Sequence, residues 1–245
     1  MIKYINNNRP KTILFLHGLA CNSSYYEDIV NLLNFKYNFL LVDLFGHYPN
    51  SKKQFTIEDE VESILKYCVY NSIKIDLIVA HSMSSIIAFY LDKAIESITI
   101  LILLEGNIIP EDFEWSSKIS SIKEKMFSVY WKKFQKQYSL LLKIKLKNKV
   151  DIEKYTNHIY KLDGFGIYCY SKIISKYQNT MDIFNNSFSK ILYIESDKST
   201  LVIDKKKLAA KYDFKLLTIS NSSHYMLIDN SKEIVDIIMG EVVCQ

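Results

Sequence analysis

The stretch IDLIVAHSMSSIIAFYL, residues 75–91, decides the fold of this chain. Its first half is a run of Ile, Leu and Val typical of a buried strand, and its second half has the apolar spacing of a helix. Ser82 lies between the two halves, where the chain must turn sharply. Such a turn pushes a serine hydroxyl clear of the backbone and leaves the amide of Met83 at the start of the helix. The pattern indicates a nucleophilic serine.

The residues that flank Ser82 must be small for this turn to form. The usual pattern is G-x-S-x-G, and here Ala80 and Ser84 stand at the two glycine positions. Taken alone, the stretch also fits an ordinary strand-to-helix connection in which Ser82 caps the helix. Motifs elsewhere in the chain have to decide between these two interpretations.

Three further motifs occur at compatible distances from Ser82. The apolar run 12–16 ends in His17-Gly18-Leu19-Ala20, and the run 39–42 is followed by Asp43-Leu44-Phe45-Gly46-His47. The run 216–219 is followed by a loop that holds His224. A strand, a His-Gly loop, a serine turn and a late histidine therefore follow one another in the order that catalysis by a serine nucleophile requires.

Short Val, Ile and Leu runs alternate with amphipathic stretches along the chain, which predicts a parallel sheet with helices on both faces. Thr56, followed by acidic residues, has the pattern of a helix start. The run 98–104 is apolar apart from Thr99 and predicts a central strand buried on both faces. We expect strands near 12–16, 39–43, 75–79, 98–104, 190–194 and 214–219, and helices over about 24–34, 57–71, 83–94, 201–211 and 231–240.

On these motifs the chain resembles the α/β-hydrolase family over nearly its whole length. The resemblance implies an α/β fold, with a mostly parallel sheet, helices on both faces and an inserted helical cap. Strand signals cease between residue 110 and about residue 187. We therefore expect residues 1–109 and 188–245 to form the core and residues 110–187 to form the cap.

The resemblance also implies roles for individual residues. A serine hydroxyl is a weak nucleophile unless a base lies within hydrogen-bond reach, and that base needs an orienting acid. Ser82 matches the family's nucleophile and His224 its general base. The backbone amides of Leu19 and Met83 match the oxyanion hole. No metal or organic cofactor is implied.

Two positions are open for the orienting acid. Many family members carry it after the penultimate strand, where the usual motif maps onto residues 196–199 and puts a serine at the acid position, with Asp197 two residues early. Others carry it at the end of the preceding strand, some two dozen residues after the nucleophile. Glu105 ends such a strand, 23 residues after Ser82, and a carboxylate there needs a partner because burying an unpaired charge is costly. We favour Glu105 over Asp197, with Glu195 third.

The expected cap is rich in aromatic residues and in lysine. We expect Trp115 and Trp131 to line a substrate pocket, whereas most of its aromatic residues attach the insertion to the core. Residues 110–149 contain ten lysines against four acidic residues, a balance of +6, so the rest of the chain sums to −2 against the total of +4. A basic cap could steer an anionic substrate or an acidic carrier protein; the alternative is an ordinary solvated helix surface. Nucleic-acid binding is disfavoured because no arginine-rich stripe accompanies the lysines.

Length and composition limit the class of protein to which this chain can belong. With 245 residues, 49% of them hydrophobic and 13% aromatic, the chain fits one packed domain with an insertion. Its longest apolar run, 98–104, is too short for a membrane span of roughly 20 residues, and the first residues lack the hydrophobic segment of a signal peptide. We therefore expect a cytoplasmic protein with no membrane partner. The four cysteines have no C-x-x-C spacing, which predicts reduced thiols and no zinc site.

The sequence therefore predicts a serine hydrolase that cleaves a carboxylic ester or thioester through an acyl-enzyme on Ser82. The substrate would be a small or medium acyl ester, or an acyl chain on a carrier such as the substrates of the pimeloyl methyl ester esterases. The family also contains C–C bond hydrolases, lactonases and lyases, among which the fold does not choose. A ligand-binding protein without catalytic activity is the alternative of another class, suggested by the altered glycines and the displaced acid.

Overall fold

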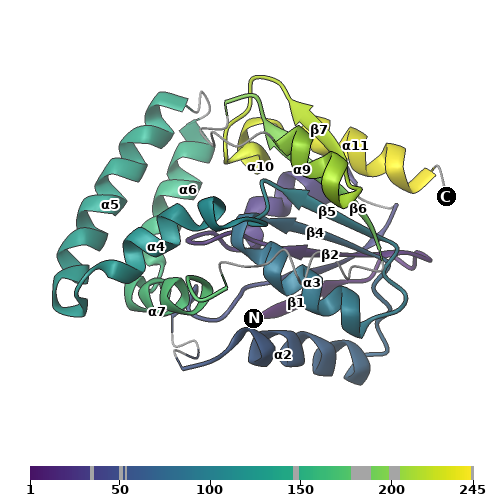
Figure 1. Ribbon diagram of the computed structural model, residues 1–245, viewed down its shortest axis with the longest axis horizontal. Coiled ribbons are helices and arrows are strands. Elements are labelled where there is room, and N and C mark those ends of the chain that lie inside the picture. The colour runs from purple at the N-terminus through teal and green to yellow at the C-terminus, as the bar shows by residue number, and fades with distance from the viewer. Residues whose placement is uncertain are drawn as a thin grey trace.

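A single mostly parallel sheet forms the centre of the molecule (Figure 1). The computed structural model describes residues 1–33, 36–49, 52, 54–145, 149–177, 189–198 and 205–243. Within them the strand order is β1-β3-β2-β4-β5-β6-β7, with β1 antiparallel to β3 and every other pair parallel. The strands are β1 (Ile2–Ile5), β2 (Thr12–Leu16), β3 (Asn38–Val42), β4 (Leu77–His81), β5 (Ile100–Leu104), β6 (Lys190–Ser196) and β7 (Lys215–Ile219).

Strand β5 is buried along its whole length between β4 and β6, as its apolar sequence predicts. Leu101, for example, pairs with Ile78 of β4 and with Ile191 of β6. Because β4 to β7 are parallel, the loops at their carboxyl ends meet at one edge of the sheet, where ligand sites of such sheets lie. This arrangement brings segments far apart in the sequence to a common place.

Helices cover both faces of the sheet, as expected (Figure 1). On one face α1 (Glu27–Leu32) packs against α11 (Ser231–Val243), and on the other α2 (Ile57–Tyr70) packs against α3 (Ser85–Ala94). The predicted start of α2 is confirmed by a capping box: the Thr56 hydroxyl accepts a hydrogen bond from the Asp59 amide at 3.1 Å, and the Asp59 carboxylate accepts one from the Thr56 amide at 2.8 Å.

Several element boundaries differ from the expectation. The helix expected over 24–34 is a 3-10 helix, η1 (Ser23–Tyr26), followed by α1, and residue 34 lies outside the described residues. The helix expected over 201–211 is α9 (Lys205–Tyr212), and residues 201–204 are not described. Strand β1 was not predicted, because four residues at the sheet edge carry little periodicity.

The described part of the segment between β5 and β6 contains helices and the short loops that join them, and no strand. After the loop 105–109 it holds the 3-10 helix η3 (Pro110–Phe113) and then α4 (Glu114–Ser121), α5 (Glu124–Lys145), α6 (Lys149–Lys161) and α7 (Gly164–Ile174). Helices α5 and α6 pack side by side at one end of the sheet, and α4 packs against α7 closer to the strands (Figure 1). Residues 146–148 and 178–187 of the expected cap lie outside the described part.

No helix in the described ranges is both long enough and apolar enough to cross a bilayer.

Candidate active site

Ser82 lies at the turn between β4 and α3. Strand β4 ends at His81, and the 3-10 helix η2 (Ser82–Ser84) leads directly into α3. The φ angle of Ser82 is 54°, a left-handed conformation that costs a non-glycine residue on the order of 1–3 kcal/mol and tends to occur at functional sites. The turn is held because the Ser82 carbonyl accepts hydrogen bonds from the Asn107 amide at 3.1 Å and from the Ser85 hydroxyl at 2.9 Å.

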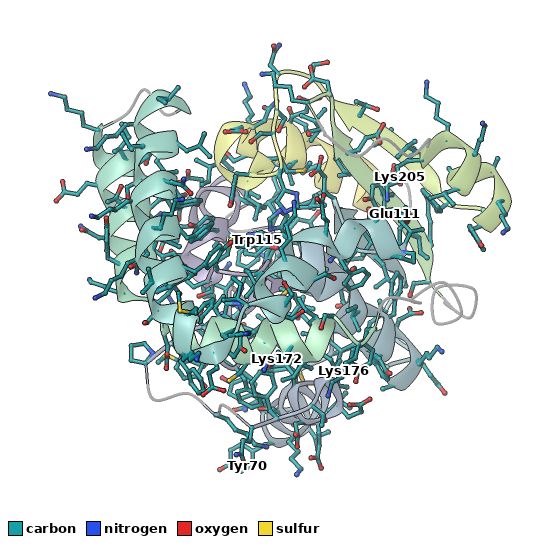
Figure 2. All side chains as sticks on the ribbon, turned by 60° about the vertical axis from the view of Figure 1, so that its left-hand side comes forward. Tyr70, Glu111, Trp115, Lys172, Lys176 and Lys205 are labelled. Carbon is teal, nitrogen blue, oxygen red and sulfur yellow. The ribbon has the colours of Figure 1, made fainter. Side chains whose placement is uncertain are left out.

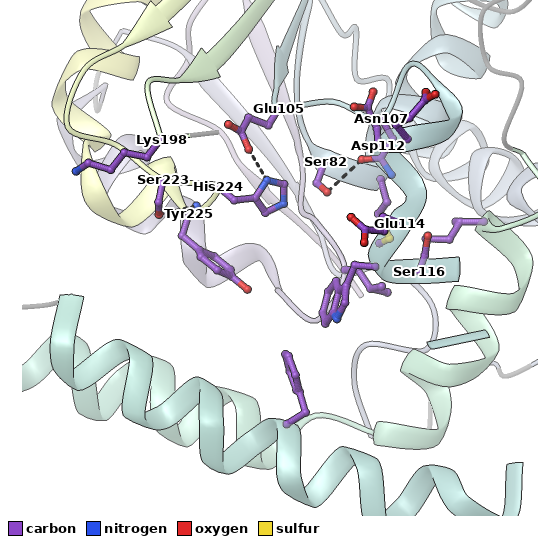
Figure 3. Close-up of a pocket in the computed structure, with 16 residues that line it drawn as sticks. Ser82, Glu105, Asn107, Asp112, Glu114, Ser116, Lys198, Ser223, His224 and Tyr225 are labelled. Carbon is purple, nitrogen blue, oxygen red and sulfur yellow. Dashed lines mark hydrogen bonds and ion pairs between the residues drawn. The ribbon is translucent and has the colours of Figure 1, made fainter. Parts of the chain in front are cut away.

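His224 is in contact with Glu105 across the edge of the sheet. Its Nδ1 lies 2.6 Å from Glu105 Oε2, although the two residues are 119 positions apart (Figure 3). Glu105 directly follows β5 and is 5% exposed, whereas the His224 side chain is 46% exposed. The second oxygen of Glu105, Oε1, accepts hydrogen bonds from the Ser196 amide at 3.0 Å and from the Ser196 hydroxyl at 2.7 Å.

These contacts keep Glu105 ionised. Burial alone would raise the pKa of its carboxyl group, but the bonds to His224 and Ser196 outweigh burial and lower this pKa to about 2. The other two carboxylates considered for the acid lie elsewhere. Asp197 accepts the amides of Asn221 and Ser222 at 2.8 and 3.2 Å, and Glu195 accepts the hydroxyl of Thr218 at 3.0 Å. Of the three, Glu105 is the one that contacts His224.

Asn107 is a site residue that the sequence analysis did not single out. The Ser82 hydroxyl donates to Asn107 Oδ1 at 3.3 Å (Figure 3). Ser82 and His224 line the same pocket, so a rotation of the Ser82 side chain from Asn107 toward the imidazole would bring the hydroxyl to the candidate base. The only sequence signal for Asn107 is its place two residues after Glu105, in the loop that leaves β5.

The loop after β2 brings Leu19 to the same pocket as Met83. His17 orders this loop, because its Nε2 accepts the Leu44 amide at 3.0 Å and its Nδ1 donates to the Gly18 carbonyl at 2.9 Å. Gly18 is required sterically: a Cβ there would lie 2.6 Å from Nδ1 of the His81 ring. The His-Gly motif thus packs the loop against the serine turn.

Four histidines besides His224 are held neutral. Burial lowers the pKa of His17 and His81 to about 3 and that of His158 to about 4, and it lowers the pKa of His47 well below the usual value. His17, His47 and His81 are at most 1% exposed, and His81 donates from Nε2 to the His224 carbonyl at 2.8 Å. Of the five histidines, only His224 lines the pocket.

The pocket above Ser82 has a volume of about 440 Å³, which is within the range of small-molecule sites. Trp115 lines it, together with Phe134 and Tyr225. Trp131 does not line it: this residue is buried behind Phe134, with ring centroids 5.3 Å apart. The expectation for Trp131 therefore changes from a contact with substrate to support of the wall.

Charges at the pocket differ from those expected for the cap. None of the eight lysines of residues 110–149 whose side chains the structure describes is among the residues that line it, and the one lining lysine among the described residues is Lys198. Asp112 in the wall pairs with buried Lys205 at 2.8 Å. Glu111 and Glu114 add further carboxylates (Figures 2 and 3). The described residues contain no group of three or more His, Cys, Asp or Glu side chains that could hold a metal ion.

Comparison with known proteins identifies relatives by structure alone. No protein-family model matches this chain, and no curated protein matches its sequence. A thermophilic esterase from Thermogutta terrifontis is similar over 99% of this chain and 92% of its own, with a TM-score of 0.78 and 14% identity. An esterase from Exiguobacterium antarcticum (98% and 94% covered) and the enol-lactonase from Burkholderia xenovorans (99% and 96% covered) each give a TM-score of 0.78 at 13% identity. At such identities the likeness establishes the fold.

Proposed function

We propose that this chain, which has the α/β-hydrolase fold, is a serine hydrolase that cleaves a carboxylic ester or thioester through an acyl-enzyme on Ser82. The observation that carries the proposal is the contact between His224 Nδ1 and Glu105 Oε2 at 2.6 Å, beside a serine in a left-handed turn. An ionised carboxylate at Nδ1 holds the proton there and leaves Nε2 free to accept one.

The reaction begins with attack of Ser82 Oγ on the substrate carbonyl, while His224 Nε2 takes the hydroxyl proton. The imidazolium that forms is stabilised by Glu105, whose charge is kept by Ser196. His224 then returns the proton to the leaving group, and an acyl-enzyme results. A water molecule, deprotonated by the same imidazole, attacks the acyl carbon and releases the acid.

The negative charge that develops on the carbonyl oxygen needs hydrogen-bond donors. The backbone amides of Leu19 and Met83 are the candidates, because both residues line the pocket beside Ser82 and Met83 is in the first turn of the helical segment. Donors of this kind are worth about 2.7–4 kcal/mol each in the transition state. The loop built on His17 and Gly18 would keep the Leu19 amide in place.

The substrate class follows from the pocket walls. Trp115, Phe134 and Tyr225 give the site an apolar side suited to an acyl group of small or medium size. An acyl chain delivered by an acidic carrier protein is a narrower form of the same proposal, suggested by the lysines of the cap. If the lysines attract an acidic carrier, the rate with a carrier-bound substrate should fall as the salt concentration rises. A rate that is independent of salt would count against the carrier form of the proposal.

A labelling experiment tests the nucleophile. Incubation with a fluorophosphonate should label the wild-type chain at Ser82, and Ser82→Ala should abolish the label. Ser120→Ala is a matched control, since this serine lies outside the pocket and its hydroxyl bonds only the Ser117 carbonyl of its own helix. A folded wild-type protein that takes no label would contradict the proposal.

A series of p-nitrophenyl esters from acetate to decanoate tests the substrate class. Turnover that is lost in Ser82→Ala would support a serine esterase, and the best chain length would measure the space beneath the cap. A labelled protein without turnover would point to a narrower substrate, such as a lactone or a C–C bond. A chain that retains a ligand without label or turnover would be a binding protein on this fold.

A further inference from the structure

Helix α5 buries one face against the rest of the molecule. A helix turns by 100° per residue, and this spacing determines which side chains share the inner face. They are apolar or aromatic, apart from one glutamine whose side chain donates a hydrogen bond to the Ile159 carbonyl at 2.9 Å. They are Phe127, Trp131, Gln135, Tyr138 and Leu142, and all are at most 8% exposed. The helix is therefore fully anchored on this side, and its opposite face points away from the protein.

The opposite face is also apolar. Met126, Val129, Leu140 and Ile144 are 52%, 63%, 60% and 80% exposed. Together with Lys133 they fall within a stripe about 60° wide that is about 27 Å long. The four apolar residues form two pairs, Met126 with Val129 and Leu140 with Ile144, which Lys133 separates along the helix. Helices of soluble proteins normally carry polar residues on the solvent side, so exposed apolar residues on this face indicate an interaction surface. We call Met126, Val129, Lys133, Leu140 and Ile144 the outer stripe.

Lysines accompany the outer stripe. Four of them form a second row directly beside it, and with Lys133 they make five exposed cations on one helix, against Glu124 as the one acidic residue of α5. None of the five pairs with a described carboxylate, whereas Lys118 and Lys154 of the neighbouring helices do pair with Glu114 and Glu27. The four lysines of the second row are Lys125, Lys132, Lys136 and Lys143.

We propose that the outer stripe and its lysine row dock this protein on an anionic lipid surface, with α5 lying in the plane of the bilayer interface. Apolar side chains that enter the acyl boundary and lysines that reach the headgroups are the features of interfacial helices. The unpaired cations favour anionic headgroups as the complementary partner. A second copy of the chain is a poor occupant, since two such faces would place like charges opposite each other.

The docking surface is connected to the candidate active site through the same helix. Phe134 of α5 lines the pocket above Ser82, and at 100° per residue its side chain leaves the helix about 110° around the axis from the middle of the outer stripe. A bilayer bound at α5 would therefore lie within one helix diameter, about 10–12 Å, of the wall of the pocket. This position would suit an enzyme whose ester substrate is dissolved in lipid.

Vesicle binding tests the proposal directly. The full chain is sedimented with vesicles of phosphatidylcholine alone and of phosphatidylcholine with phosphatidylglycerol, at low and high salt. We expect binding to the anionic vesicles that weakens with salt. Leu140→Gln/Ile144→Gln should lower the partition at least tenfold, and a triple change of lysine to glutamine should lower it roughly 100-fold, at about fivefold for each residue. The three lysines are Lys132, Lys136 and Lys143.

A matched control uses two other exposed apolar residues. Val69 and Tyr70 at the end of α2 are 80% and 89% exposed and lie far from α5 (Figures 1 and 2). Val69→Gln/Tyr70→Gln should bind vesicles like the wild type, and so should Ser82→Ala, which separates docking from the proposed chemistry. Absence of binding to anionic vesicles at low salt would overturn the proposal. Equal loss of vesicle binding in the α2 and α5 variants would also overturn the proposal. So would binding to an acidic carrier protein that depends on the outer stripe, without binding to vesicles.

Discussion

Replacing Glu105 with glutamine should nearly abolish activity while the protein stays folded. The glutamine Oε1 can still accept the amide and hydroxyl of Ser196, so the buried hydrogen bonds on that side persist. The amide nitrogen, however, would face Nδ1 of His224 at the position where Oε2 now lies at 2.6 Å. Because this nitrogen only donates, Nδ1 must become the acceptor, and the ring proton moves to Nε2. His224 can then no longer take the proton of Ser82.

The expected loss is about four orders of magnitude in kcat, as in other triads whose acid is replaced by its amide. This corresponds to about 5.4 kcal/mol of transition-state stabilisation. The assay is turnover of the best p-nitrophenyl ester at neutral pH, with the rate of fluorophosphonate labelling as a second readout. Asp197→Asn is the matched control: its one side-chain oxygen keeps the bond from either the Asn221 or the Ser222 amide, which now bond to different oxygens of Asp197. Because Asp197 does not contact His224, we expect kcat within about threefold of the wild type.

Two results would refute this reasoning. A Glu105→Gln protein that keeps more than a tenth of the wild-type kcat would show that Glu105 does not orient the base. A loss of several orders of magnitude in Asp197→Asn, with Glu105→Gln active, would move the acid to the position after β6. Thermal melts of both variants separate either result from simple unfolding.

Three further changes have outcomes that the structure specifies. Gly18→Ala should lower kcat at least tenfold and should also lower the melting temperature by several degrees, because the new Cβ would lie 2.6 Å from the buried His81 ring. Burial raises the pKa of Glu60 from 4.5 to about 7, so between these pH values the folded chain keeps a proton that the unfolded chain releases. Urea titrations should therefore show the free energy of unfolding falling by about 3 kcal/mol from pH 4.5 to pH 7. The Glu60→Gln variant should not show this fall. Lys205→Met should cost 3–5 kcal/mol of unfolding free energy, since it leaves Asp112 buried without its partner, and adding Asp112→Asn should restore part of that loss.

The secondary structure of the core was predictable because its signals are local. Buried strands such as β5 are continuous apolar runs, and the start of α2 depends on Thr56 and Asp59, which are three residues apart. Strand β1 escaped prediction because its stability comes from pairing with β3, more than 30 residues away in the chain, and not from its own four residues. The division of η1 from α1 likewise depends on packing that periodicity does not record.

Some residues of the candidate site could be predicted from the sequence and others could not. The turn at Ser82 has a local pattern, so its position between strand and helix could be read from neighbouring residues. The choice of acid stayed open, because Glu105 follows β5, Asp197 follows β6 and Glu195 lies near the end of β6. Only the twist and register of the sheet decide which of these carboxylates reaches His224. Asn107 was missed because its contact with Ser82 depends on the path of the loop after β5.

The sequence by itself determined the α/β architecture, the order of its strands along the chain and the position of a serine at a sharp turn. These features follow from the spacing of apolar residues and from turn chemistry within a few residues. Only the tertiary structure decided that Glu105 contacts His224, that Trp115 lines the pocket while Trp131 supports it, and that the five described lysine side chains of α5 lie outside the pocket beside an apolar stripe. Contacts across more than a hundred residues depend on how parallel strands bring distant loops to one edge, which no local pattern encodes.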